Sequence, residues 1–210
     1  MAELLSKKRL VRILIGTGLF WICGAMMKMN FQPWGQQVLH LQTMTQVSLL
    51  GLWLSIGVMV GSIMAGQMYA VGDLRGTQRY GWLLAIGIAL LGGMRWFILA
   101  GFSSPLGFVI FNLIAAGVAA GLFLIPLNAA LQAESHQGKL GKTIATQNMI
   151  ENVAMLAGSG FAYINIKIGF DPSQLFLALA ALVAVVSIFL KIPLAKSTGS
   201  TTQVELAETA

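Results

Sequence analysis

The chain has 210 residues, of which 57% are hydrophobic and only 10% are charged, and its mean hydropathy is +0.79. Soluble domains carry about 25% charged residues, so this composition excludes a soluble globular protein and predicts an integral membrane protein. The single cysteine, Cys23, excludes an intramolecular disulfide and a cysteine-rich metal cluster.

Six apolar runs are each long enough for a transmembrane helix, which needs about 20 residues. Apolar and polar residues do not alternate along the runs, so they predict helices and not the strands of a membrane barrel. Short turn segments separate them, and consecutive helices are therefore expected to be antiparallel. The predicted fold is an all-α membrane protein with six transmembrane helices, at residues 10–31, 45–70, 80–101, 106–131, 142–166 and 173–194.

The ends of the chain differ from the apolar middle. Residues 1–9 are expected to form a cytoplasmic N-terminal segment, residues 10–194 the transmembrane domain, and residues 195–210 a disordered cytoplasmic tail rich in Ser, Thr and Glu. The first run is longer than the core of a signal peptide and lacks a cleavage motif, which predicts a retained helix. We expect this helix to end at QPWGQQ, where Pro33 and Gly35 interrupt it.

The distribution of Lys and Arg predicts how the chain lies in the membrane. Three of the thirteen basic residues, Lys28, Arg95 and Lys167, fall on one side of the predicted spans. The positive-inside rule then places both termini in the cytoplasm and explains the net charge of +6 without nucleic acid. The ten on the other side are Lys7, Lys8, Arg9, Arg12, Arg75, Arg79, Lys139, Lys142, Lys191 and Lys196.

Motifs for catalysis, metal binding and nucleic-acid binding are missing from the sequence. It contains no helix-turn-helix pattern, phosphate-binding loop, paired CxxC or HExxH motif. No Ser-His, His-Asp or double-carboxylate set falls at membrane depth, and both histidines, His40 and His136, lie in predicted loops. We therefore expect neither an enzyme nor a bound cofactor.

One predicted span carries a carboxylate and several amides in its middle. Glu151 follows Lys142 by nine residues, which places it about 13 Å into a hydrocarbon core that is ~30 Å thick. Gln147 and Asn148 precede it by four and three positions and share its helix face, and Asn152 extends that face. Acidic residues at this depth usually face a cavity or a partner. The alternative is a cluster that only joins helices by hydrogen bonds.

Two cationic residues also lie within apolar runs. Lys28 and Arg95 each follow a basic residue by sixteen positions, or about 24 Å of helix. Long side chains at that height can reach the lipid headgroups, which is the structural interpretation for Arg95. Lys28 is open to that interpretation and to a functional one.

Three segments resemble a known family. GLFWICGAMMK (residues 18–28), GLFLIPLNAALQ (121–132) and GKTIATQNMIENVAML (141–156) are similar to the seventh helix and the later helices of bacterial lysophospholipid transporters, a branch of the major facilitator superfamily. The loop GDLRGTQR (72–79) is similar to the charged loop of major facilitators, although Asp73-Leu74-Arg75 departs from their usual Asp-Arg pair. Its expected role is a tight, charged cytoplasmic turn, with Arg79 at its end.

This resemblance implies half of a major-facilitator-type bundle, because the six predicted spans match only the second half of that fold. The first half would come from another chain or from a second copy, or the chain is a remnant of a split gene. The cavity-lining residues that the resemblance implies are Lys28, Asn128, Gln147, Asn148, Glu151 and Asn152.

The resemblance predicts a transporter that moves lysophospholipid across the bacterial inner membrane towards the cytoplasmic leaflet by alternating access. Lys28 would attract a lipid phosphate, and Glu151 would pair with Lys28, an ethanolamine ammonium or a coupling cation. The alternative is a non-transporting membrane subunit or remnant that scaffolds an acyltransferase or a partner half. The expected partners are the bilayer, the substrate and these proteins, and no nucleic acid.

Overall fold

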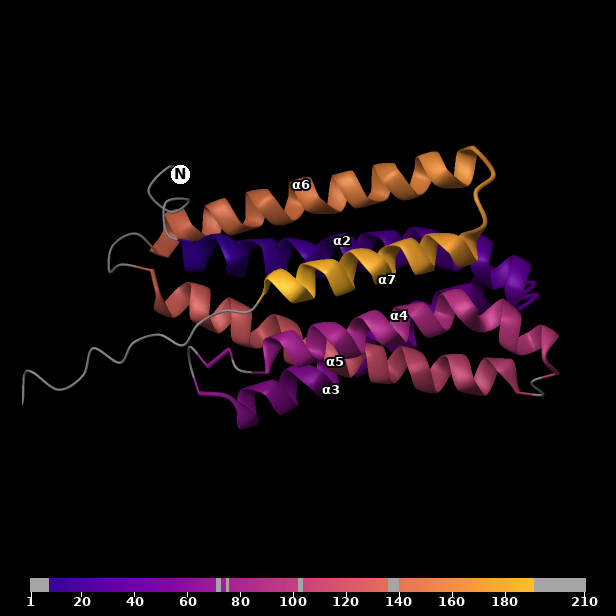
Figure 1. Ribbon diagram of the computed structural model, residues 1–210, viewed down its shortest axis with the longest axis horizontal. Coiled ribbons are helices and arrows are strands. Elements are labelled where there is room, and N and C mark those ends of the chain that lie inside the picture. The colour runs from indigo at the N-terminus through magenta and orange to yellow at the C-terminus, as the bar shows by residue number, and fades with distance from the viewer. Residues whose placement is uncertain (1–7, 71–72, 75, 102–103, 136–139, 191–210) are drawn as a thin grey trace, which may run out of the picture.

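The computed structural model describes residues 8–70, 73–74, 76–101, 104–135 and 140–190. Within these ranges the chain forms six helices and no strand. All six run along the long axis of one elongated bundle, and consecutive helices are antiparallel, as predicted (Figure 1). The helices are α2 (Lys8–Val38), α3 (Met44–Met68), α4 (Thr77–Leu99), α5 (Pro105–Ala133), α6 (Leu140–Lys167) and α7 (Pro172–Phe189).

Helix α2 lies at the centre of the bundle. It contacts α3, α5, α6 and α7, and it runs between α6 and α7 (Figure 1). The other close pairs are α3 with α5, α4 with α5 and α4 with α7. Helix α6 therefore depends mainly on α2 for its position, since it has few contacts with α5 and α7.

Five helices, all except α6, are long and apolar enough to cross a membrane within the part of the chain that is described. Helix α6 has the required length, but its amides and Glu151 make it more polar. Large apolar side chains also cover the outside of the bundle, as shown by Trp96, Phe111 and Leu156, each more than 70% exposed. Soluble monomers rarely expose such surfaces. These features identify a multi-pass membrane protein, and membrane crossing by α6 stays a prediction.

Helix α2 is longer than predicted, which corrects the expected break at QPWGQQ. The helix begins at Lys8 and continues through Pro33 and Gly35 to Val38. Proline removes one backbone hydrogen bond from a helix interior. Tertiary contacts outweigh that loss, because the fully buried Trp34 packs edge-on against Phe176, with ring centroids 5.4 Å apart. Asn30 also donates from Nδ2 to the Pro172 carbonyl at 2.8 Å.

Helices α3 and α5 approach each other through four glycines. Gly57 and Gly61 face Gly117 and Gly121, so that backbone lies directly against backbone. A Cβ atom at Gly61 would lie 2.2 Å from the Val118 carbonyl oxygen, which is closer than atoms can pack. Small residues at four-residue spacing are the usual means of such close packing in membranes.

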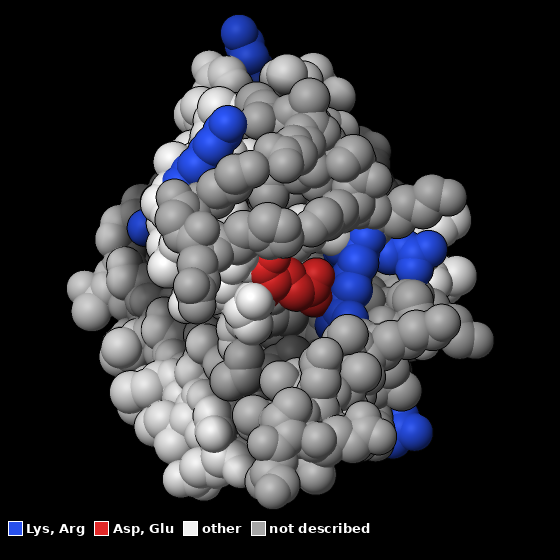
Figure 2. Space-filling view, turned by 90° about the vertical axis from the view of Figure 1, so that its left-hand side faces the viewer, with Lys and Arg blue, Asp and Glu red and all other residues white. Residues whose placement is uncertain are grey.

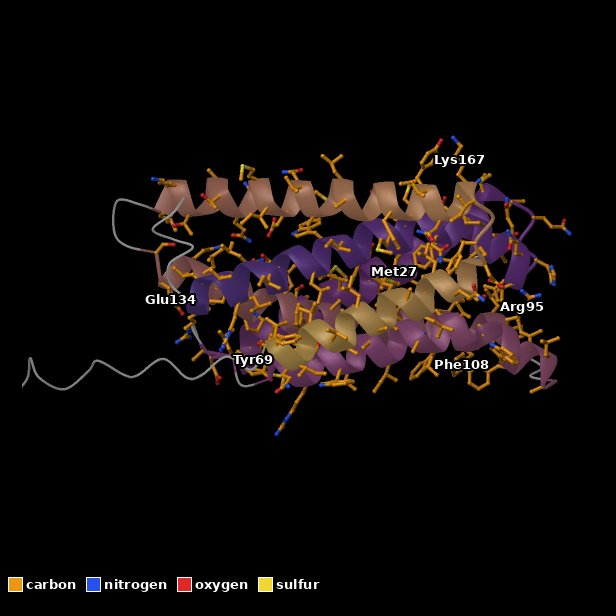
Figure 3. The ribbon with its side chains drawn as sticks, turned by 45° about the horizontal axis from the view of Figure 1, so that its top comes forward. Met27, Tyr69, Arg95, Phe108, Glu134 and Lys167 are labelled. Atoms are coloured by element: carbon orange, nitrogen blue, oxygen red, sulfur yellow. The ribbon has the colours of Figure 1, made fainter. Side chains whose placement is uncertain are left out.

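The two ends of the bundle carry different charged groups. At one end, where α2 begins and α5 ends, Arg9 Nε lies 2.8 Å from Glu134 Oε1. Figure 2 looks onto this end and shows basic side chains on several sides of a small acidic patch. Tyr69 lies at the same end as Glu134, whereas Arg95 and Lys167 lie at the opposite end (Figure 3). This separation agrees with the two groups used to predict the orientation.

Replacing Gly61 with Ala tests the close packing of α3 on α5. The added methyl group would push α3 away from the Val118 carbonyl, and overpacking of this kind costs about 1–3 kcal/mol. We expect a lower melting temperature for the purified protein in detergent, measured by circular dichroism.

The matched control for this experiment is Gly66→Ala on the same helix, where a Cβ atom would meet nothing within 4 Å. Alanine favours helix over glycine, so the control should be neutral or slightly stabilising. Equal melting temperatures for the two variants would contradict the packing described above.

Candidate functional site

Helix α6 docks on α2 through a face that combines small and polar residues. Gly158 permits the contact, because a Cβ atom there would lie 3.2 Å from the Ile22 carbonyl oxygen. On the facing helix, Gly18 lies opposite Ile150 and Ala154. The buried positions of α6 recur every three or four residues, as expected for one helix face. They are Thr143, Thr146, Gln147, Glu151, Ala154, Gly158 and Ala162.

The amide of Gln147 joins Glu151 to helix α5. Its Nε2 atom donates to Glu151 Oε1 at 2.7 Å and to Asn128 Oδ1 at 2.8 Å. Gln147 and Glu151 are each 8% exposed, and Asn128 is half-buried. Three of the predicted cavity residues therefore form one hydrogen-bonded cluster.

The carboxylate of Glu151 has few partners. Among the described residues it accepts one hydrogen bond, from Gln147, and no cation pairs with it. A buried carboxylate is costly unless it is paired with a cation or fully hydrogen-bonded. The arrangement leaves Glu151 able to accept a cationic group from a ligand or an ion.

The predicted polar face of α6 divides into a buried part and an exposed part. Asn148 and Asn152 are exposed, and Asn152 Nδ2 donates to the Asn148 carbonyl of the same helix at 2.7 Å. Because successive residues are rotated by about 100° around a helix, these two amides lie beside the strip that carries Gln147 and Glu151. The polar surface is continuous, but this chain alone does not enclose it.

Lys28 is separated from the cluster. It is exposed on α2, and it takes part in no ion pair among the described residues. Gly18 marks the level of Glu151 on α2, and Lys28 follows ten residues later, about 15 Å further along the helix. Its neighbour Met27 lies well inside the length of the bundle (Figure 3). The structure thus provides no Lys28–Glu151 pair.

The chain is 30% identical over 157 residues to the lysophospholipid transporter LplT of Photorhabdus laumondii, covering 74% of this chain and 37% of that protein. Its identity to LplT of Enterobacter is 28% over 172 residues, covering 81% of this chain and 41% of the relative. LplT of Klebsiella pneumoniae is 29% identical over 174 residues, with coverages of 82% and 41%. The chain is thus similar to bacterial lysophospholipid transporters over most of its own length.

Two further results define the extent of this relationship. The chain spans well under half the length of these LplT relatives. No family model matches it, and no solved structure matches it. The similarity confirms the resemblance stated from the sequence, and the relatives are named as transporters, not as enzymes.

The charged loop that resembles the major-facilitator loop lies outside the cluster. Asp73 is half-buried and Arg79 is exposed, whereas Arg75 lies outside the described residues. The backbone N–H of Asp73 donates to the Ala70 carbonyl at 3.0 Å, which forms part of a tight turn before α4. Arg79 already belongs to the first turn of α4, and the role of this segment as a charged cytoplasmic turn stays a prediction.

Two tyrosines bind the ends of α3 and α4 together beside this loop. The hydroxyl groups of Tyr69 and Tyr80 are hydrogen-bonded. Burial, followed by this hydrogen bond, raises the pKa of Tyr69 to about 12. A Cβ atom at Gly76 would lie 2.5 Å from the Tyr69 hydroxyl, which explains why glycine precedes α4.

Sequence reasoning missed the partner of Arg95. Arg95 Nη1 donates to Asp171 Oδ2 at 2.8 Å, so the side chain is ion-paired although it is 61% exposed. Asp171 also caps α7 by accepting from the Ser173 N–H at 2.8 Å. The Asp-Pro-Ser sequence is a recognisable helix start, and it could have indicated a carboxylate at this end of the bundle.

Replacing Gln147 with Leu tests the hydrogen-bonded cluster. The change would remove both bonds and leave oxygens of Glu151 and Asn128 without partners, which costs about 1–3 kcal/mol. We expect reduced stability in detergent unfolding experiments.

The control is Asn148→Leu, at the next position, where the side chain is exposed and carries none of these bonds. Such a surface change is usually within about ±0.5 kcal/mol. If the two variants unfold alike, Gln147 does not stabilise α6 as described.

Proposed function

We propose that this chain is one half of a lysophospholipid transporter in a bacterial inner membrane, with both termini in the cytoplasm. Together with a second half it would move lysophospholipid towards the cytoplasmic leaflet by alternating access. The observation that carries this proposal is the similarity to proteins named lysophospholipid transporter over about three quarters of the chain. The Gln147–Glu151–Asn128 cluster supplies the candidate site.

The uncovered part of the polar face supports a second half. Asn148 and Asn152 are exposed on a helix that docks against a membrane span. Polar side chains at membrane depth usually face the bundle interior or a water-filled cavity, because lipid cannot hydrogen-bond to them. A second half placed over this face would complete a passage, with Gln147 and Glu151 in its wall. Either another chain or a second copy of this chain would supply it.

The substrate class fits such a passage. A lysophospholipid has one acyl chain and a charged headgroup, so it requires a polar surface with apolar surroundings. In major facilitators the site lies between two repeats that rock against each other. The polar face of α6 would meet the headgroup, and the apolar residues beside it would meet the chain.

Lys28 and Glu151 would act at successive positions. With the predicted orientation, Lys28 lies nearer the outer leaflet, from which the substrate comes. Its exposed ammonium group would attract the lipid phosphate as a point charge. Glu151 lies about 15 Å closer to the cytoplasmic end, where its carboxylate would accept an ethanolamine ammonium or a coupling cation.

The second candidate function is a non-transporting membrane subunit or remnant that scaffolds an acyltransferase or a partner half. The hydrogen bonds of the Gln147–Glu151–Asn128 cluster also fit this alternative, because such a cluster can serve only to join α6 to α5. Transport by the purified chain in liposomes, alone or with a co-purifying membrane partner, would distinguish the two. A neighbouring reading frame that encodes six further spans would also favour transport.

Replacing Glu151 with Gln tests the proposed site. The variant keeps the size of the side chain and one oxygen that can still accept the hydrogen bond from Gln147, but it removes the charge. We expect loss of labelled lysophosphatidylethanolamine uptake in spheroplasts, with membrane abundance unchanged on an immunoblot. Normal uptake would refute the role of Glu151, and a scaffold would tolerate the change.

Replacing Lys28 with Ala tests the cationic position. We expect this variant to take up much less lysophospholipid than the two controls, Lys167→Ala and Arg95→Ala. The controls remove exposed positive charges at the C-terminal end of α6 and on α4. Losing an exposed pair such as Arg95–Asp171 usually costs no more than ~1 kcal/mol. Equal uptake by the three variants would mean that Lys28 only anchors α2 among headgroups.

A further inference from the structure

A groove of about 320 Å³ runs along α2 on the side away from the Glu151 cluster. Helix α2 forms its floor, and α6 and α7 form its walls. Every described residue that lines it is apolar, including Ile15, Gly18, Ile22, Ile150, Leu182 and Val186.

The groove exists because α6 and α7 both pack on α2 and have few contacts with each other. Gly18 contributes no side chain to the floor. On the open side, Ile15 is 50% exposed and Leu182 is 40% exposed, so the groove opens laterally from the bundle. Its volume lies at the lower end of the range for small-ligand pockets, about 300–1,000 Å³.

The position of the groove determines what can fill it. Both α2 and α7 are long and apolar enough to span a membrane, and the groove follows α2 from Val11 to Ile22. It therefore lies at hydrocarbon depth, in the half of the bundle that carries Arg9 and Glu134. Water and polar ligands would find no hydrogen-bonding side chain there, and an empty groove would forfeit dispersion contacts along its walls.

We propose that this groove binds one acyl chain of a bilayer phospholipid from the leaflet at the Arg9–Glu134 end. The chain would contact α6 through Ile150 and α7 through Leu182 and Val186. It would thereby join two helices that have few direct contacts. The chemistry of the site is that of a saturated or monounsaturated hydrocarbon chain whose headgroup stays at the membrane surface.

The groove does not belong to the proposed transport site. The groove has α7 as one wall, whereas Glu151 is joined through Gln147 to Asn128 of α5. The proposed occupant is a resident two-chain lipid of the bilayer, and this inference stands whether or not the chain transports lysophospholipid.

The experiment uses the full chain in vesicles of phosphatidylethanolamine and phosphatidylglycerol that contain phosphatidylethanolamine with a diazirine in mid-chain. After irradiation, mass spectrometry locates the lipid adducts. We expect adducts concentrated at Ile15, Ile150 and Leu182, above those at Leu156, which is more exposed at 74% but lies outside the groove. Excess unlabelled phosphatidylethanolamine should suppress the groove adducts at saturation.

The variant Ile15→Trp would fill the groove and should abolish the adducts at Ile150 and Leu182. Leu182→Trp is a second variant that fills it from the opposite wall, and Leu156→Trp is the matched control that should leave the pattern unchanged. Both filling variants replace half-exposed side chains, so neither places an indole in the core.

Three results would overturn the proposal. The number of lipid adducts at each residue could follow the exposed fraction of its side chain alone, so that Leu156 carries the most. The filling variants could give the same pattern as Leu156→Trp. A lysophosphatidylethanolamine probe could label the groove while the two-chain probe does not, which would assign the groove to the transported lipid.

Discussion

The contact between α6 and α2 is the constraint on which the candidate site depends. It is built from small residues, Gly18 on α2 and Ala154 and Gly158 on α6, which allow the two helices to approach closely. Because α6 has few contacts with α5 and α7, this contact sets its rotation and height. The rotation turns Gln147 and Glu151 towards Asn128 on α5, where the side-chain amide of Gln147 donates to one oxygen of Asn128 and one oxygen of Glu151.

The same contact divides the surroundings of α6 into two chemically distinct sides. On the α5 side lies the polar cluster, with exposed amides beside it. On the α7 side lies a groove whose described lining residues are all apolar. Helix α6 thus separates a polar surface from an apolar one. It also keeps any resident acyl chain away from the carboxylate.

The low number of partners at Glu151 gives the cluster its chemical interest. A carboxylate with a full set of donors or a cationic neighbour would be a structural element, and ligand binding would have to break those interactions. Among the described residues a single amide, that of Gln147, orients the group, and Lys28 is too far away to neutralise it. The exposed amides of Asn148 and Asn152 extend the polar surface of α6 beyond the buried cluster.

Much of this protein follows from local properties of the sequence. Six helices, their antiparallel order and the separation of basic residues between the two ends reflect apolar run length and charge placement, which act residue by residue. The pairing of Gln147 with Glu151 also follows from their four-residue spacing on one helix.

Contacts between helices determined the remaining features, because such contacts depend on which helix faces pack together. The burial of Trp34 against Phe176 stabilises α2 as a continuous helix through Pro33. The Asp171 carboxylate forms an ion pair with Arg95. The docking of α6 on α2 buries Gln147 and Glu151 and leaves Asn148 and Asn152 exposed. Helix periodicity places residues on a face, but only the packed bundle determines which part of that face is covered.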